Sequence, residues 1–227
     1  MKHLVLSILL ILLYNFSVAI ERPDFIKAVA DNKITPTIVG STISGSPYGE
    51  AAEISIQNET GETIETVLEK GTILESENPD TQDLVVSKDL PLQVGPYEYL
   101  DPPVSVFCIE INNKAPTIFD FYKPPSRKAT GDLMKLIDYI DRNNLHDSRS
   151  AQLAVWSITD DLTMNKAIID GYGSSSEVSS AKSILDNCNI RNSFSNNDGN
   201  PFIIYFFGII LYCVFIVFIL KFITKAI

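Results

Sequence analysis

Between about residue 37 and residue 110, apolar and polar positions alternate in short runs separated by turn signals. Ala52, Ile54 and Ile56 alternate with polar neighbours, which is the period of a half-buried β-strand. The same pattern predicts about eight strands, at 37–44, 52–57, 64–68, 71–74, 84–87, 90–94, 97–100 and 104–109. Strand signals at roughly ten-residue spacing are typical of an antiparallel β-sandwich. We therefore predict an immunoglobulin-like sandwich over residues 20–125.

After the Pro-Pro pair at 124–125 the period becomes helical. Apolar residues recur three and four positions apart over 133–140 and again over 151–158, where Asp147 or Ser148 is a suitable N-cap. A short helix opens at Asp161, and a fourth follows over 178–188. Because short helices bury little surface alone, we expect residues 126–188 to form a small helical unit docked on the sandwich. The predicted fold class is α+β.

The N-terminus has the pattern of a cleavable export signal. Lys2 and His3 precede an apolar run, and a small-residue pattern ends at Ala19. This order of positive, apolar and small residues predicts a signal peptide over residues 1–19. The remainder of the chain is then expected outside the cytoplasm.

The C-terminal part predicts attachment to a membrane. Residues 201–223 are apolar except for Lys221 near their end, and a transmembrane helix needs about 20 apolar residues. Lys221 and Lys225 lie on the C-terminal side of this run, so the positive-inside rule predicts a cytoplasmic tail at 224–227. Residues 189–200 are rich in Asn and Ser and are typical of a juxtamembrane stalk. These features predict a single-pass type I protein, integral to the cell membrane or another secretory-pathway membrane.

Composition removes several classes of function. The formal net charge is −10, and the basic residues form no cluster, which argues against nucleic acid as a partner. His146 is the only histidine beyond the predicted signal peptide, so sites built from several imidazoles are excluded. We find no nucleophile–base–acid set, phosphate loop or cofactor motif, and we expect no enzyme activity, no metal and no cofactor.

Two strings suggest covalent chemistry. Val-Phe-Cys-Ile-Glu at 106–110 ends a predicted strand, and Ser-Ala-Gln-Leu-Ala-Val-Trp at 150–156 lies on a predicted helix. Together they resemble the thioester domains of bacterial surface adhesins, over about residues 106–161. The resemblance implies that the Cys108 thiol is acylated by the Gln152 side chain with loss of ammonia, and that Trp156 is the aromatic residue that follows the Gln. An amine on another surface would then capture the thioester.

The residues themselves leave the state of Cys108 open. Cys108 and Cys188 are the only cysteines outside the apolar run that holds Cys213, and an oxidising compartment favours a Cys108–Cys188 disulfide. Cys108 could equally be an unpaired, buried residue that packs as a small hydrophobe. The Cys108–Gln152 thioester is the third alternative.

A further candidate site is a glycosylation acceptor. Asn58-Glu59-Thr60 forms the sequon on a predicted hairpin tip, where a glycan at Asn58 could be accommodated. For the whole chain, we expect a domain that binds or adheres to a protein or surface ligand. The covalent adhesin is one alternative, and a structural small subunit of a membrane complex is another.

Overall fold

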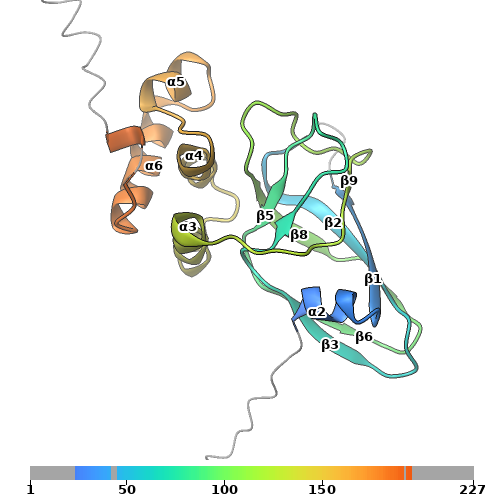
Figure 1. Ribbon diagram of the computed structural model, residues 1–227. Helices are drawn as coiled ribbons and strands as arrows, with labels where there is room; N and C mark the ends of the chain where they lie inside the picture. Colours follow the sequence, from blue (N-terminus) through green and yellow to red (C-terminus); the bar gives the residue numbers. More distant parts are fainter. Residues whose placement is uncertain (1–23, 42–44, 192, 196–227) are drawn as a thin grey trace, which may run out of the picture.

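The computed structural model describes residues 24–41, 45–191 and 193–195. Within them the chain first forms a short helix and a series of strands, and then helices only (Figure 1). The first part comprises α2 (Phe25–Ala30), β1 (Ile34–Gly40), β2 (Tyr48–Asn58), β3 (Ile64–Leu68), β4 (Ile73–Leu74), β5 (Leu84–Val86), β6 (Leu90–Val94), β7 (Tyr99–Leu100), β8 (Pro103–Cys108) and β9 (Phe121–Tyr122). The second comprises α3 (Gly131–Arg142), α4 (Arg149–Thr159), α5 (Met164–Ile169), α6 (Ser175–Asn187) and the 3-10 turn η1 (Ser193–Ser195).

The main sheet of the described residues has seven antiparallel strands. Its order is β4-β5-β8-β2-β1-β9, and β7 pairs with β2 beyond β8. The sheet curls until its two ends meet, because Ser76, after β4, bridges to Tyr122 of β9. On either side of that bridge, Glu77 N donates to Phe121 O at 2.9 Å and Lys123 N donates to Glu75 O at 2.8 Å. Strands β3 and β6 form a separate two-stranded sheet, against which α2 packs.

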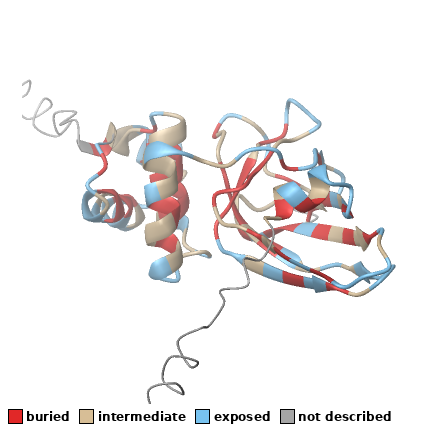
Figure 2. Cartoon of the chain, turned by 60° about the horizontal axis from the view of Figure 1, so that its bottom comes forward, coloured by how far each residue is buried: buried red, intermediate tan, exposed pale blue. Residues whose placement is uncertain are grey.

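Strand alternation places the apolar side chains inside this curled sheet. Ile54 and Ile56 of β2 and Val106 of β8 are fully buried. Tyr48 and Gly49 pair with Phe107 and Val106, and the register then shifts before Ala52. Such a bulge bends a strand, and Gly49 adopts a φ of +80° there. Figure 2 shows the buried positions inside the curled sheet and between the helices.

Helix α4 is the centre of the helical unit. It contacts α3, α6, η1 and β8, and every residue from Ala151 to Ser157 is buried. The Ser148 side chain accepts a hydrogen bond from Ala151 N at its start, as the sequence predicted. Helix α6 begins with a capping box formed by Ser174 and Glu177. Helix α4 also lies against β8, the strand that ends at Cys108.

The predicted immunoglobulin-like sandwich is wrong. A sandwich needs two sheets that face each other, whereas here one antiparallel sheet curls until its own ends join. Both arrangements bury one face of each strand, so the alternation of apolar residues is the same in both. The pattern therefore located most of the strands but could not say which strands pair.

The membrane part of the predicted fold class is also corrected. No helix among the described residues is long and apolar enough to cross a membrane, so this structure provides no transmembrane or single-pass element. The signal peptide of 1–19, the helix of 201–223 and the tail of 224–227 were predicted for segments outside the described residues. Of the predicted stalk, Phe194 is buried and the Ser193 hydroxyl donates to Leu162 O.

Candidate functional site

Cys108 and Gln152, which are 44 positions apart in the sequence, are in direct contact. Cys108 N donates to Gln152 Oε1 at 3.1 Å, and Gln152 Nε2 donates to Cys108 O at 2.8 Å. The side-chain amide therefore pairs with both backbone groups of a single residue. This pairing holds the amide carbon of Gln152 beside the residue that carries the thiol.

The ends of two elements create this contact. Cys108 is the last residue of β8, and on one side it pairs with Leu84 of β5. On its other side β2 begins only at Tyr48, and Pro47 O accepts from Cys108 N at 2.8 Å. Gln152 lies in the first turns of α4, and its side chain reaches Cys108 at the position just before β2 begins. A helix side chain thus pairs with Cys108 where the neighbouring strand does not extend.

The pair is enclosed by protein. Cys108 and Gln152 each have 0% of their surface exposed. Burial raises the pKa of the Cys108 thiol far above its usual range, and the nearby Glu110 carboxylate raises it further. The thiol is therefore protonated at neutral pH and is not a ready thiolate nucleophile. Its chemistry is confined to groups that the fold itself encloses with it, and Gln152 is a buried residue in contact with the Cys108 backbone.

A further polar contact joins the helical unit to the sheet. Just beyond the end of α4, Asp160 Oδ1 accepts from Ile111 N at 3.2 Å. Sequence reasoning missed this contact, because the two residues are 49 positions apart in the chain.

Trp156 lies one turn beyond Gln152 on α4. It is 6% exposed and packs against Tyr172 in an edge-to-face contact, with ring centroids 5.7 Å apart. Its indole Nε1 has no acceptor among the described residues. The side chain is thus part of the core that supports the Gln152 turn.

The structure does not bring Cys108 and Cys188 together. Both are free thiols. Cys188 is the C-cap residue of α6 and lies half-buried beside Tyr139 and Arg142, whereas Cys108 lies at the end of β8. Burial raises the pKa of Cys188, and Arg142 opposes that shift. Of the two partners proposed for Cys108 from the sequence, the structure places Gln152 beside it.

Asn58 has a structural position. It is fully buried, and its Nδ2 donates to the backbone carbonyls of Glu62, Val94 and Gly95. Its Oδ1 accepts from both the backbone and the hydroxyl of Thr60. A glycan is attached through Nδ2, which in this fold is enclosed and engaged. The side chain instead joins the β2–β3 turn to the end of β6.

His146 lies between the helical unit and the sheet. Its Nδ1 is 3.2 Å from the Ser87 hydroxyl, and its Nε2 is 3.6 Å from Asp141 Oδ1. Burial lowers its pKa, and Asp141 opposes that shift. Among the described residues no group of three His, Cys, Asp or Glu side chains is arranged to hold a metal ion.

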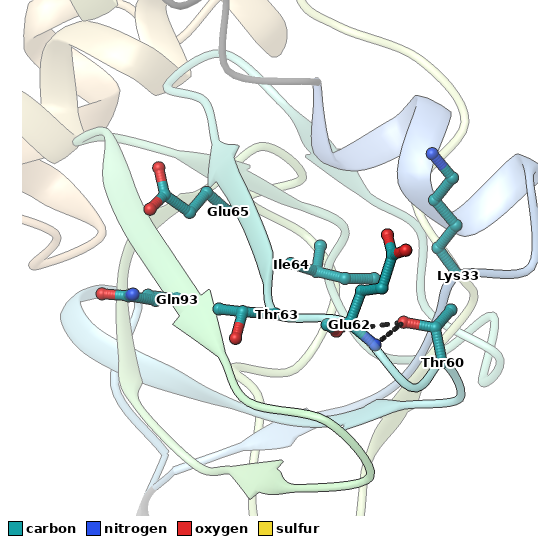
Figure 3. Close-up of a pocket in the computed structure, with 7 residues that line it drawn as sticks. All are labelled: Lys33, Thr60, Glu62, Thr63, Ile64, Glu65 and Gln93. Atoms are coloured by element: carbon teal, nitrogen blue, oxygen red, sulfur yellow. Dashed lines mark hydrogen bonds between the residues drawn. The ribbon is translucent and has the colours of Figure 1, made fainter.

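A hollow lies elsewhere, at the turn before β1 and the β3–β6 sheet (Figure 3). It has a volume of about 450 Å³ and is open to solvent. Its lining, which includes two acidic residues and one basic residue, is formed by Lys33, Thr60, Glu62, Thr63, Ile64, Glu65 and Gln93. Thr60 Oγ1 is hydrogen-bonded within the turn to Glu62. No nucleophilic side chain in its lining is hydrogen-bonded to the side chain of a general base, and neither Cys108 nor Gln152 lines the hollow.

Comparison of this chain with protein-family models, curated proteins and solved structures gave no match.

Proposed function

We propose that this protein binds its target covalently, through an internal thioester between Cys108 and Gln152. One observation carries the proposal: a buried thiol-bearing residue pairs with the side-chain amide of a buried glutamine. The resemblance of residues 106–110 and 150–156 to the thioester domains of surface adhesins supports the same chemistry. The protein would act once per molecule, as a binding protein and not as an enzyme.

Thioester formation would join two residues whose contact runs through the Cys108 backbone. Cys108 Sγ attacks the Gln152 amide carbon, and negative charge develops on Oε1, to which Cys108 N donates. The thiol proton passes to Nε2, which Cys108 O holds at 2.8 Å. The C–N bond then breaks, ammonia leaves, and a C–S bond joins the two side chains.

In the capture of a target, the Cys108 sulfur is the leaving group instead of the nucleophile. A primary amine attacks the thioester carbonyl, its nitrogen forms an amide with the former Gln152 acyl group, and the C–S bond breaks. The sulfur leaves with the proton that the amine gives up, which restores the Cys108 thiol. Water would hydrolyse the same bond and leave glutamate at position 152. The full burial of both residues supports a role in keeping water out.

Methylamine tests the proposal. The full-length chain is incubated with methylamine and then digested, and each peptide is weighed. We expect methylamine to join the side chain at position 152 and the Cys108 thiol to become alkylatable at the same time. Cys108→Ala is the matched control and should take up none. Equal uptake by wild type and Cys108→Ala, or none by either, contradicts the proposal.

A second candidate function is non-covalent binding, favoured by an exposed apolar tip between β8 and β9. Ile118, Phe119 and Phe121 are 39%, 76% and 49% exposed. The tip is held by Asp120, whose carboxylate accepts from Thr117 and Thr81. Large apolar side chains presented on a fixed backbone are typical of binding surfaces. If this function is the principal one, Cys108→Ala retains target binding and Phe119→Ser loses it.

A further inference from the structure

Two exposed tyrosine rings belong to the same end of the fold as the hollow of Figure 3. Tyr97, in the loop after β6, is 69% exposed, and Tyr99 of β7 is 66% exposed. The Tyr97 hydroxyl lies against Gly61, where a Cβ would be 3.4 Å from Tyr97 Oη. Gly61 stands between Thr60 and Glu62, which both line the hollow. The Tyr97 ring is therefore at the margin of the hollow.

Both rings are held at their hydroxyl ends. Tyr99 pairs with Gln57 of β2, and its hydroxyl donates to Gln57 Oε1 at 2.8 Å. Because the two residues are directly opposite each other, the Tyr99 ring leans across the sheet toward β2. Tyr97 has a φ of +57°, a left-handed conformation that is rare for a large side chain. Residues held in such conformations cluster at functional sites, so the exposure of this ring calls for a binding role.

The buried side chain of Asn58 fixes the tyrosine-bearing loop relative to the hollow. Its Nδ2 donates to Gly95 O at 2.8 Å, two residues before Tyr97. Its Oδ1 accepts from the backbone and from the hydroxyl of Thr60, in the lining of the hollow. One buried side chain thus joins the loop after β6 to the β2–β3 turn. A site that is already ordered loses less conformational freedom when a ligand binds.

The lining of the hollow offers polar groups to a ligand. Its volume of about 450 Å³ is in the range of small-molecule sites. Within the described part of the chain, the side chains of Glu62, Glu65 and Gln93 have no hydrogen-bond partner. Carboxylates accept hydrogen bonds, and the amide both donates and accepts them. Lys33 is the one cation among the described residues of the lining, so the two carboxylates leave the hollow with a net negative charge.

We propose that the hollow and the two tyrosines form a binding site for an uncharged oligosaccharide. The face of an aromatic ring is negative and attracts the C–H groups on one side of a pyranose ring. Sugar hydroxyls donate to carboxylates and exchange hydrogen bonds with an amide, which are the groups that the lining presents. The negative lining, on a chain of net charge −10, repels acidic sugars. The inference goes beyond the proposed function and does not depend on the thioester.

A saccharide array tests the site. The full-length chain is applied to neutral oligosaccharides of glucose, galactose, mannose and N-acetylglucosamine, with sialylated and sulfated saccharides on the same array. We expect binding to at least one neutral oligosaccharide, whose affinity is then measured by calorimetry. Tyr97→Gly removes one ring and leaves the residue that best tolerates the left-handed backbone. Tyr97→Gly and Tyr99→Ala should each weaken the affinity about tenfold, the effect of losing one stacked ring.

Phe119→Ser is the matched control. Phe119 is also a highly exposed aromatic residue, but it belongs to the tip between β8 and β9 and does not line the hollow. Its replacement should leave saccharide affinity unchanged. Binding to no neutral oligosaccharide, or only to the sialylated or sulfated ones, overturns the site. Wild-type affinity in either tyrosine variant, or an equal loss in Phe119→Ser, overturns it as well.

The saccharide site and the thioester can fail separately. Cys108→Ala cannot form the thioester, but it should bind the oligosaccharide as tightly as wild type, because Cys108 does not line the hollow. Methylamine uptake at position 152 should likewise be the same in Tyr97→Gly as in wild type. Loss of saccharide binding in Cys108→Ala would contradict a separate site.

Discussion

Gln152 satisfies the backbone of Cys108, and this predicts an asymmetry between the two residues. Gln152→Ala leaves the buried Cys108 carbonyl without its donor, so we expect the free energy of unfolding to fall by about 1–3 kcal/mol. Cys108→Ala keeps both backbone hydrogen bonds and should cost less. Neither variant can form the thioester, so urea unfolding compares them on equal terms. A larger loss for Cys108→Ala would contradict the bonding described.

Asn58 gives a second prediction. Its three backbone acceptors lie in the β2–β3 turn and at the end of β6, so Asn58→Ala should lower the free energy of unfolding by about 1–3 kcal/mol. Thr60→Ala also destroys the sequon but leaves these bonds, and it should cost less. Expression in a glycosylating host should give no glycan at Asn58. Quantitative occupancy of the folded protein would show that the buried position is wrong.

The sequence located the thiol and its amide partner because both lie in short strings with a distinctive residue order. It could not reveal the role of Asn58, because a sequon records residue types and not the direction in which a side chain points. The stacking of Tyr48 on Phe107 could not be predicted either, because it depends on β2 pairing with β8, two strands that lie far apart in the chain.

Of the elements, β2 shows most directly how the backbone shapes the site. The strands predicted from the sequence over 37–44 and 52–57 leave 45–51 outside them, but the structure places Tyr48 and Gly49 inside β2, with a bulge before Ala52. Gly49 has a φ of +80°, and a Cβ there would lie 2.6 Å from Asp147 Oδ1. The element was misjudged because Gly and Pro mark both turns and bulges.

Gly49→Ala should therefore destabilise the start of β2 by about 1–2 kcal/mol, the cost of a left-handed residue with a side chain. It should also displace the loop before α4 and speed the reaction of Cys108 with thiol reagents. Gly61→Ala is the control, since its Cβ would meet only Tyr97 Oη at 3.4 Å. Thermal unfolding and thiol labelling measure the two effects. Equal behaviour of the two variants would show that Gly49 carries no special constraint.

For the molecule as a whole, the sequence predicted strands followed by helices, and that order is observed. The closure of the sheet was not predictable, because it depends on backbone bonds between Glu77 and Phe121 and between Glu75 and Lys123. Backbone pairing leaves little trace in residue type. The docking of the helical unit was expected from its size, but the residues that hold it were not.

One of those residues, His146, predicts a pH dependence of stability. Burial holds its pKa below the usual 6.5, against the pull of Asp141 and Asp147, while Lys88 and Lys70 lower it further. The unfolded chain then binds the proton more readily than the folded one. This contribution is complete above pH 6.5 and is lost as the pH falls from 6.5 toward the lower, folded pKa.

Urea unfolding at pH 7.5 and pH 5.5 should thus show a lower free energy of unfolding at the acidic value. In His146→Gln this loss should be smaller, because the titrating group is absent. Asp83 and Asp160, whose pKa values burial raises, act in the opposite direction and only toward more acidic pH. If the free energy of unfolding changes by the same amount between pH 7.5 and pH 5.5 in wild type and in His146→Gln, the role of His146 is refuted.

The intact mass of the natively folded chain tests the covalent proposal most directly. A Cys108–Gln152 thioester lowers it by one ammonia, about 17 Da, relative to the sum of the residues of the processed chain. The account predicts this deficit in wild type and its absence in both Cys108→Ala and Gln152→Ala. A wild-type chain of full mass, with a free Cys108 thiol and an intact Gln152 amide, would contradict it.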